Sequence, residues 1–189
     1  MAISYDKIYK DTMKLYRQHG TRDPKTILEN RGVNFVAFNQ NTKLLGMYKV
    51  IKRNRFVFYN PYVDENLLRM VLGHELGHDL YHRKYASNGA LIEYELFNIN
   101  SAMELEANIF AAHLLLDEDE IIEFIYEGYT YDQLAATFNV NVNLMIFKLN
   151  EMHRMGLPIR KGDLANREFF IEIDGKDPKN IDNSFHHDS

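Results

Sequence analysis

The stretch His74-Glu75-Leu76-Gly77-His78 places two histidines four residues apart, with a glutamate directly after the first. On an α-helix, residues i and i+4 project from one face a turn apart, so both imidazoles can point at one spot. The preceding residues favour such a helix, because Asp64 is a good N-cap and apolar residues follow at helical spacing, namely Leu67, Leu68, Val71 and Leu72. We therefore predict a single helix that carries the motif and presents both histidines together.

This spacing is the one that zinc-dependent hydrolysis requires. A zinc ion held by three protein ligands keeps a fourth position for water and lowers the pKa of that water to about 7. Glu75 lies beside the first histidine and can accept a proton from the attacking water. The chain has no cysteine, so the ligands must be nitrogen and oxygen atoms. We predict that His74 and His78 bind Zn²⁺ and that Glu75 is the catalytic base.

The third ligand must come from another segment. His82 lies about 12 Å from His74 along the predicted helix axis, too far to share the ion, so we expect it to pack or hydrogen-bond behind the ligands. Glu104 is the preferred third ligand, and Asn108 shares its helical face and can hydrogen-bond a motif histidine. The competing interpretation is a capping box from Ser101 to Glu104, which would bind the carboxylate to backbone.

The composition limits the classes of protein to which the chain can belong. Its 189 residues, 46% of them hydrophobic, can bury the core of one domain with a small addition. A net charge of −5 argues against broad neutralisation of nucleic-acid phosphates. The N-terminus lacks the pattern of a secretory signal, and no stretch has the length of a membrane span. We therefore expect a cytoplasmic protein that binds no membrane.

Periodicity and turn residues predict a mixture of helices and strands. Residues 5–19 read as an amphipathic helix, and Asp23-Pro24 begins a second, short helix that ends before Gly32. Residues 33–38, 44–51 and 55–59 are rich in β-branched and aromatic side chains and predict a three-stranded antiparallel meander. After a polar loop around residues 87–89, a long helix is expected from about Glu93 to Leu116, with Phe97 on its inward side.

The segment after this helix has the spacing of a helix-turn-helix. It runs from Thr130, a candidate N-cap, to Leu149, and its expected small core contains Leu134, Ala135, Phe138, Val140, Leu144 and Leu149. A helix that reads DNA needs residues that reach base edges or phosphates. The polar residues expected on the second helix offer few positive charges, namely Asn141, Asn143, Lys148 and Asn150. We favour packing on the rest of the protein, or docking of a protein partner, over DNA binding.

Two motifs together carry a family resemblance. Residues 74–82 (HELGHDLYH) and 104–116 (ELEANIFAAHLLL), in their order and separation, resemble the ImmA/IrrE metallopeptidases. The resemblance implies an α+β fold, a minimal thermolysin-like zincin with a small antiparallel sheet and a motif helix. It also implies Zn²⁺ bound by His74, His78 and Glu104. The chain departs from the usual pattern at Asp117, where a proline is frequent, and at His113, where glutamate is commoner; we expect His113 at the edge of its helix.

The resemblance further implies a division of the chain and a biological role. We expect a zinc metallopeptidase domain at residues 1–120, a helix-turn-helix-like segment at 121–157 and a partly disordered C-terminal tail at 158–189, with a strand-like stretch at 168–173. The implied role is an endopeptidase of phage or mobile-element origin that cleaves an intracellular regulator, such as a helix-turn-helix repressor. The residue that stabilises the oxyanion stays open among Tyr81, Tyr85, Tyr94 and His113.

Two other functions compete with this interpretation. The fold could serve as an antirepressor or antitoxin-like binding protein that cleaves nothing, or as a DNA-binding transcription regulator that retains the zincin fold. Replacement of Glu75 by glutamine separates the first rival from a protease, because it removes the base and keeps the metal ligands. Salt-dependent binding to duplex DNA would identify the second.

Overall fold

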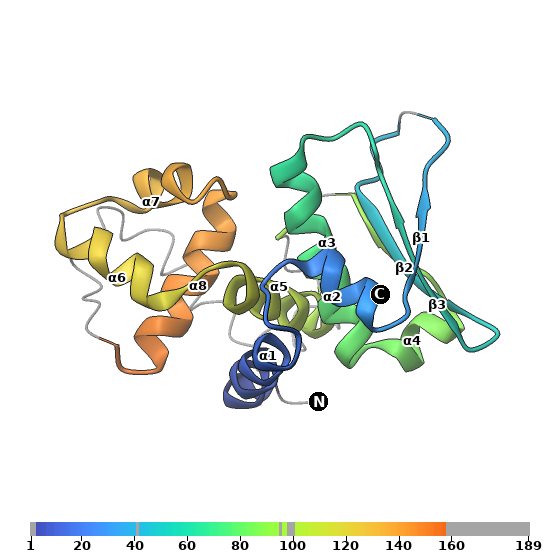
Figure 1. Cartoon of the computed structure of the whole chain (residues 1–189), viewed down its shortest axis with the longest axis horizontal. Coiled ribbons are helices and arrows are strands. Elements are labelled where there is room, and N and C mark those ends of the chain that lie inside the picture. The colour runs from blue at the N-terminus through green and yellow to red at the C-terminus, as the bar shows by residue number, and fades with distance from the viewer. Residues whose placement is uncertain (1–2, 41, 95, 98–100, 158–189) are drawn as a thin grey trace, which may run out of the picture.

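A computed structural model describes residues 3–40, 42–94, 96–97 and 101–157, and within them lie eight helices and one four-stranded sheet. The sheet forms one side of the molecule, and most of the helices lie on its other side (Figure 1). The expected strand-like stretch at 168–173 and the expected tail lie outside the described residues. The elements in chain order are α1 (Tyr5–His19), α2 (Pro24–Asn30), β1 (Asn34–Ala37), β2 (Gly46–Ile51), β3 (Asn54–Tyr59), α3 (Glu65–Tyr81), α4 (Arg83–Asn88), β4 (Leu91–Glu93), α5 (Ala102–Leu115), α6 (Glu118–Tyr126), α7 (Tyr131–Thr137) and α8 (Val142–Arg154). The predicted α+β class is confirmed.

The sheet is mixed, so the predicted antiparallel meander is wrong. Its strand order is β1-β3-β2-β4, in which β2 and β3 form an antiparallel hairpin, β1 runs parallel to β3, and β4 runs antiparallel to β2. Lys52 and Arg53 at the hairpin turn both have positive φ (48° and 69°), the backbone of a type I′ turn. The strand β3 lies between β1 and β2, although it follows both in the sequence. Strand patterns in a sequence do not reveal which strands become neighbours.

The segment between α3 and α5 also differs from the prediction. The long helix expected from Glu93 begins only at Ala102, and Glu93 instead ends β4, where it pairs with Gly46 of β2. A strand of three residues has too little alternation to be recognised in sequence, and its pairing with β2 alone defines it. Phe97 is buried as expected, but it precedes α5 with a φ of 66°.

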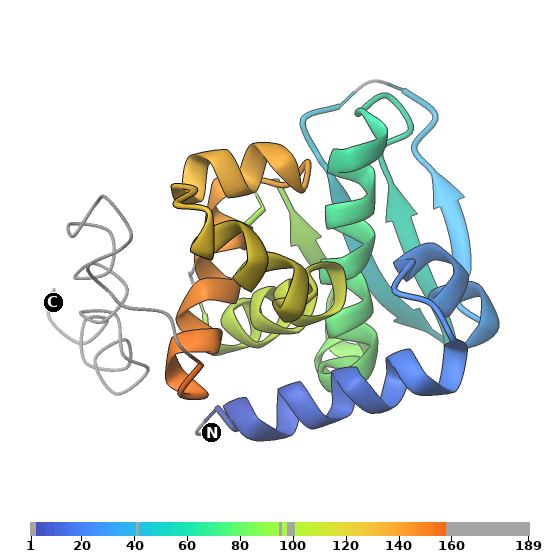
Figure 2. The same cartoon turned by 60° about the vertical axis from the view of Figure 1, so that its left-hand side comes forward.

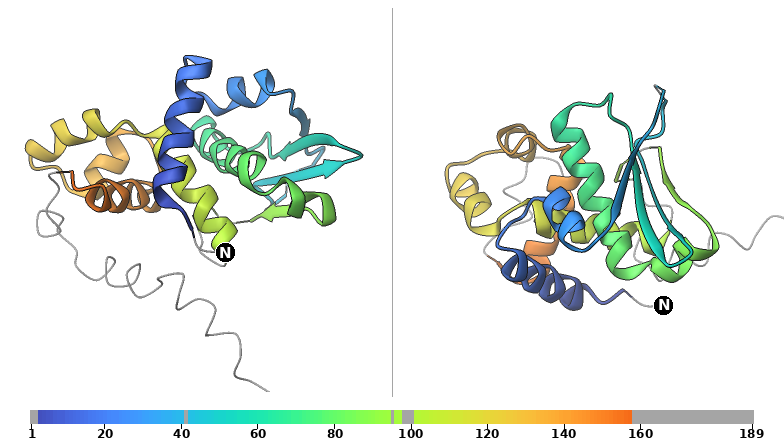
Figure 3. Two further views of the ribbon diagram at one scale, coloured as in Figure 1. Left: turned by 90° about the horizontal axis from the view of Figure 1, so that it is seen from below. Right: turned by 45° about the vertical axis from the view of Figure 1, so that its right-hand side comes forward.

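The motif helix α3 lies at the centre of the layers. It packs against β2 and β3 on one side and against α5 on the other, while α1 and α8 pack on α5 (Figures 2 and 3). Tyr48 and Val57, which pair across β2 and β3, are fully buried, as are Leu76 of α3 and Phe110 of α5. Among the described residues, none of the helices combines the length and the apolar character needed to cross a bilayer.

The crossing of α3 and α5 is unusually close at Gly77. A Cβ atom placed on Gly77 would lie 2.9 Å from the Cα atom of Ala107. The two backbones therefore approach each other with only a hydrogen and a methyl group between them. This approach brings the second motif of the sequence within side-chain reach of the first.

The helix-turn-helix predicted after residue 130 is present, and its second helix is buried. Thr130 caps α7 through a capping box with Gln133, and α8 follows after a tight turn at Phe138–Asn141. Residues 144–149 of α8 are all buried. The single cation among them, Lys148, is fully buried and lies 2.6 Å from a carboxylate oxygen of Glu118.

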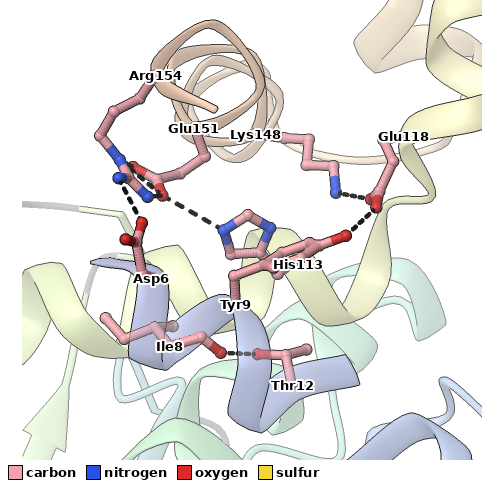
Figure 4. Close-up of polar contacts among 9 residues, drawn as sticks. All are labelled: Asp6, Ile8, Tyr9, Thr12, His113, Glu118, Lys148, Glu151 and Arg154. Atoms are coloured by element: carbon pink, nitrogen blue, oxygen red, sulfur yellow. Dashed lines mark hydrogen bonds and ion pairs between the residues drawn. The ribbon is translucent and has the colours of Figure 1, made fainter. Parts of the chain in front are cut away.

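Polar contacts fasten α8 to α1 and α5 (Figure 4). Glu151 lies 3.4 Å from His113 of α5 and 2.7 Å from Arg154, which also binds Asp6 of α1 at 3.0 Å. The expectation that His113 lies at the helix edge is wrong, because it is fully buried with its ring edge-on to Tyr9. The cause is α8, which covers this side of α5.

The close helix crossing yields a stability prediction. Gly77→Ala adds a methyl group against the backbone of Ala107, so overpacking should cost about 1–3 kcal/mol, more than the roughly 1 kcal/mol gained in helix propensity. The matched control is Gly73→Ala in the same helix, whose new Cβ meets only the side chain of Leu115 and no backbone. Urea denaturation should show Gly77→Ala to be the less stable variant. Equal stability of the two variants would mean that the helix crossing can accommodate a methyl group at Gly77 without strain.

Candidate metal centre

The helix α3 brings the three motif side chains into the interior. The Asp64 side chain accepts a hydrogen bond from the Leu67 N–H and so begins the helix as predicted. His74, Glu75 and His78 are 1%, 0% and 2% exposed, so none of them is in bulk water. The Nε2 atoms of the two histidines lie 3.0 Å apart, which shows that both rings point at the same spot.

Glu104 of α5 joins this pair. Its Oε2 atom lies 3.0 Å from His74 Nε2 and 3.6 Å from His78 Nε2, and the three donor atoms all lie within 4.8 Å of one another. Donors around a tetrahedral zinc ion are separated by about 3.3 Å, given bonds of about 2.0–2.1 Å. Ser101 does accept a hydrogen bond from the Glu104 N–H, but the carboxylate faces the histidines and not the backbone. The donor set therefore fits a metal ion.

Hydrogen bonds behind the two histidines orient their rings. Asn108 Oδ1 accepts a hydrogen bond of 2.8 Å from His74 Nδ1. On the other ring, His78 Nδ1 lies 2.8 Å from His82 Nδ1, and His82 Nε2 donates to a carboxylate oxygen of Glu106 at 3.0 Å. With Nδ1 of each ring engaged from behind, Nε2 is the nitrogen that each ring presents to a metal at the centre.

His82 lies one turn after His78, at the end of α3, and contacts its ring. The helix stops at Tyr81, and His82 is its C-cap with a φ of −118°. It lies outside the group of three donors, where the sequence argument also placed it, and contacts the ligand from behind. Glu106, to which the sequence assigned no role, extends this line of contacts to the surface of α5.

Glu75 is buried without a hydrogen-bond partner among the described residues. Both of its carboxylate oxygens are enclosed, and a Cβ atom on Gly46 of β2 would lie 2.5 Å from one of them. Burial raises the pKa of Glu75 to about 8; the charge of His74 opposes this shift, and the carboxylates of Glu93 and Glu104 add to it. A glycine in β2 thus leaves the space that the proposed base occupies.

Glu93 is a residue that the sequence argument missed. Its Oε2 atom lies 3.2 Å from His74 Nε2, so a third carboxylate reaches the centre from β4. The sequence carries no periodic signal for it, because the approach depends on the pairing of Glu93 with Gly46. Only the placement of β4 at the sheet edge reveals this neighbour.

The electrostatics of the centre call for a cation. Burial opposes a charge on His74, yet the nearby carboxylates of Glu104 and Glu93 raise its pKa to about 10. Burial lowers the pKa of His78 to about 4, so this ring stays neutral. A divalent metal ion held by these donors can replace the proton of His74 and supply the positive charge that the surrounding carboxylates require.

An ion-pair cluster fixes the motif helix directly after His78. Asp79 is fully buried, and its carboxylate accepts hydrogen bonds from the Tyr48 hydroxyl (2.8 Å) and from Arg31 (2.9 Å), Arg55 (3.1 Å) and Arg83 (3.1 Å). Burial acts to raise the pKa of Asp79, but the Tyr48 hydroxyl and the arginine charges hold it below its usual range. These contacts tie α3 to α2, α4 and two strands.

The candidates for oxyanion stabilisation lie in different surroundings. His113 is on the side of α5 that faces α1 and α8. The Tyr81 ring packs on Phe110 and its hydroxyl donates to Asp11 at 3.5 Å. Tyr85 and Tyr94 are 52% and 65% exposed. The structure therefore commits two of the four candidates to other contacts.

The chain is similar in sequence to known proteins over the residues that form this centre. The model of a peptidase family described as the IrrE N-terminal-like domain matches residues 28–150, which include every residue of the centre. The "Uncharacterized immunity region protein 2" of Bacillus phage phi105 is 28% identical over 144 residues, 76% of this chain and 90% of that protein. The "Metallopeptidase ImmA" of Bacillus subtilis (strain 168) is 28% identical over 124 residues, 61% of this chain and 64% of that protein.

The raised pKa of Glu75 predicts a pH-dependent stability of the metal-free protein. Its pKa is about 8 when folded against a usual value of 4.5, so the folded state binds the proton more tightly. This stabilisation is complete below pH 4.5 and is lost as the pH rises through 8, an effect on the order of a few kcal/mol.

Urea denaturation in the presence of a chelator, at pH 5 and pH 8, checks this expectation. The free energy of unfolding should fall more steeply with pH in the natural protein than in Glu75→Gln, which has no carboxyl group to titrate at this position. Identical losses in the two proteins would show that Glu75 does not hold its proton in the folded state.

Proposed function

The chain belongs to the IrrE N-terminal-like family of peptidases, and on this premise we propose that it is a zinc-dependent endopeptidase that cleaves an intracellular regulator. The observation that carries the proposal is the convergence of His74, His78 and Glu104 within 4.8 Å of one another, beside a buried glutamate. A metal held by such nitrogen and oxygen donors supplies Lewis-acid chemistry, activating water and polarising the scissile carbonyl.

Glu75 is the general base of the proposed peptide hydrolysis. Its carboxylate accepts the proton of the attacking water and then returns it to the amine nitrogen of the leaving peptide. A pKa raised by burial suits both transfers, because the group holds a proton readily near neutral pH; a nearby cation counters this rise and favours the carboxylate. Gly46 matters here, because any larger residue would push Glu75 from its position.

An extended peptide suits the outer edge of the sheet. In the described part of the chain, β4 has a strand neighbour on one side only, since β2 occupies the other. An unpaired edge can accept an added strand through backbone hydrogen bonds, which recognise a polypeptide regardless of its sequence. Because Glu93 of this strand lies 3.2 Å from His74 Nε2, a peptide bound there passes close to the catalytic residues.

We propose a helix-turn-helix repressor of a phage or mobile element as the substrate. The name of the phage relative refers to an immunity region, and the name of the bacterial relative is a metallopeptidase, which together favour proteolysis of a phage regulator. The alternative hypothesis is an antirepressor or antitoxin-like protein that binds its partner and does not cleave it. This hypothesis does not account for the Glu75 carboxylate, which is buried without a hydrogen-bond partner among the described residues.

The DNA-binding rival has less support. The second helix of the helix-turn-helix is packed against α5 and α7, and its central residues are buried. Lys148, the cation that could have met a phosphate, is paired with Glu118 in the interior. Binding of a duplex by this helix would require α8 to leave its site.

Removal of the base should abolish cleavage and leave the metal in place. We expect Glu75→Gln to lower peptidase activity by at least about a hundredfold, because general base catalysis is worth that much or more. The substrates are the helix-turn-helix repressors of the genome that encodes this chain, incubated with the purified zinc-loaded protein and followed by mass spectrometry. Metal analysis should find one equivalent in Glu75→Gln and none in His78→Ala.

The control is Glu120→Gln, which removes an exposed carboxylate of α6 and should cleave as the natural protein does. Undiminished cleavage by Glu75→Gln would refute the proposed base. A partner that is inactivated equally well by Glu75→Gln, without a cut, would establish the binding rival instead.

The burial of α8 predicts that the protein does not bind duplex DNA. Electrophoretic mobility of operator-length duplexes should be unchanged at micromolar protein even at low salt, where phosphate contacts are strongest. Duplex DNA binding that weakens steeply with added salt would contradict this prediction and favour the alternative of a DNA-binding transcription regulator.

A further inference from the structure

A line of side-chain contacts leads from the candidate metal centre to the surface of α5. His78 Nδ1 lies 2.8 Å from His82 Nδ1, and His82 Nε2 lies 3.0 Å from Oε2 of Glu106. His82 is 2% exposed, whereas the Glu106 side chain is 27% exposed and so borders the solvent. Both nitrogens of the His82 ring are therefore engaged, one by a candidate metal ligand and the other by a carboxylate.

The close helix crossing puts Glu106 in this position. Glu106 directly precedes Ala107, whose backbone lies against Gly77 of α3. His82 follows the last residue of that helix. Two carboxylates of α5 thus reach α3 with different partners, since Glu104 faces the donor nitrogens of the centre and Glu106 faces His82.

The contact between the two Nδ1 atoms restricts where the ring protons can lie. At a separation of 2.8 Å one nitrogen has to donate and the other has to accept, because two protons would collide and two lone pairs would repel. A carboxylate only accepts hydrogen bonds, so Glu106 requires a proton on His82 Nε2. A neutral His82 ring then has a lone pair on Nδ1, and His78 has to donate from its own Nδ1.

This distribution of protons determines whether His78 can bind a metal. A neutral imidazole carries one ring proton, so a proton on Nδ1 leaves Nε2 of His78 free to coordinate. If His82 held its proton on Nδ1 instead, His78 would carry its proton on Nε2, the nitrogen that faces the other donor atoms. The acceptor behind His82 therefore decides which nitrogen of His78 is available.

We propose that Glu106 is a positioning residue of the metal centre, which acts through His82 and fixes His78 in the tautomer that can bind the ion. The inference deepens the proposed function and rests on it only in assuming a metal on His74, His78 and Glu104. Glu106 itself contacts neither the metal nor the substrate in this role. Its essential property is that it accepts a hydrogen bond and cannot donate one.

The tautomer of His78 can be measured in the metal-free, full-length protein. Protonated and unprotonated ring nitrogens differ widely in ¹⁵N chemical shift, and the His78 signals are assigned by their absence from His78→Gln. The spectra are recorded at pH 8, where an imidazole of ordinary pKa, about 6.5, is neutral. The natural protein should hold the His78 proton on Nδ1. Glu106→Lys, whose ammonium group only donates, should move that proton to Nε2.

Zinc affinity should follow the tautomer. We expect Glu106→Lys to bind Zn²⁺ about a hundredfold more weakly in competition with a chelator, the upper end of what contacts behind metal ligands are worth. Glu106→Gln keeps an acceptor oxygen and should lose less than about tenfold. The matched control is Glu123→Lys, the same change of charge on an exposed residue of α6, which should keep the natural tautomer and the natural affinity.

Two outcomes would overturn the proposal. One is a Glu106→Lys protein in which His78 still holds its proton on Nδ1. The other is a loss of zinc affinity in Glu106→Gln as large as in Glu106→Lys, because the negative charge and not the accepting role would then be essential.

A second variant covers the case in which Glu106→Lys folds poorly. Glu106→Leu neither donates nor accepts a hydrogen bond at this position, so it should show a mixture of the two His78 tautomers. The natural tautomer alone in this variant would equally refute the role of Glu106. The ring shifts are read without metal and without cleavage, so a failure of the proposed protease activity in the Glu75→Gln experiment is a separate result.

Discussion

The close contact between α3 and α5 is the constraint on which the centre depends. Gly77 allows the backbone of α5 to approach at Ala107, and the donors of both helices lie within one turn of that contact. Glu104 then faces His74 and His78, while Asn108 supports His74 from behind. A larger residue at position 77 would separate the two helices and the donor atoms with them.

Charge is the second organising factor, because the interior of this protein holds many ionisable groups. Asp79 is balanced by three arginines and a tyrosine hydroxyl, and Lys148 is balanced by Glu118. The group formed by His74, His78, Glu75, Glu93 and Glu104 has an excess of carboxylates by comparison. Buried charges persist only when they are compensated, and in this group a protonated His74 or a metal ion in its place can provide the compensation.

The two sides of α5 contact different parts of the protein. One side presents Glu104 and Asn108 to the motif helix, and the other side presents His113 to α1 and α8. The helices α6 to α8 are thereby joined to the frame that holds the centre. Their helix-turn-helix geometry packs short helices on one another, and Lys148 of the second helix is buried and paired with Glu118.

The sequence by itself determined the motif helix, its Asp64 cap and the shared face of Glu104 and Asn108, because helical periodicity and capping are local properties. The candidate metal ligands His74, His78 and Glu104, and the contact of His82 behind them, could likewise be placed by spacing. Only the tertiary structure decided that β1 lies beside β3, that Glu93 comes from a sheet edge, and that His113 is buried under α8. These depend on which distant segments become neighbours, and no periodicity along one segment records the identity of the segment that will pack against it.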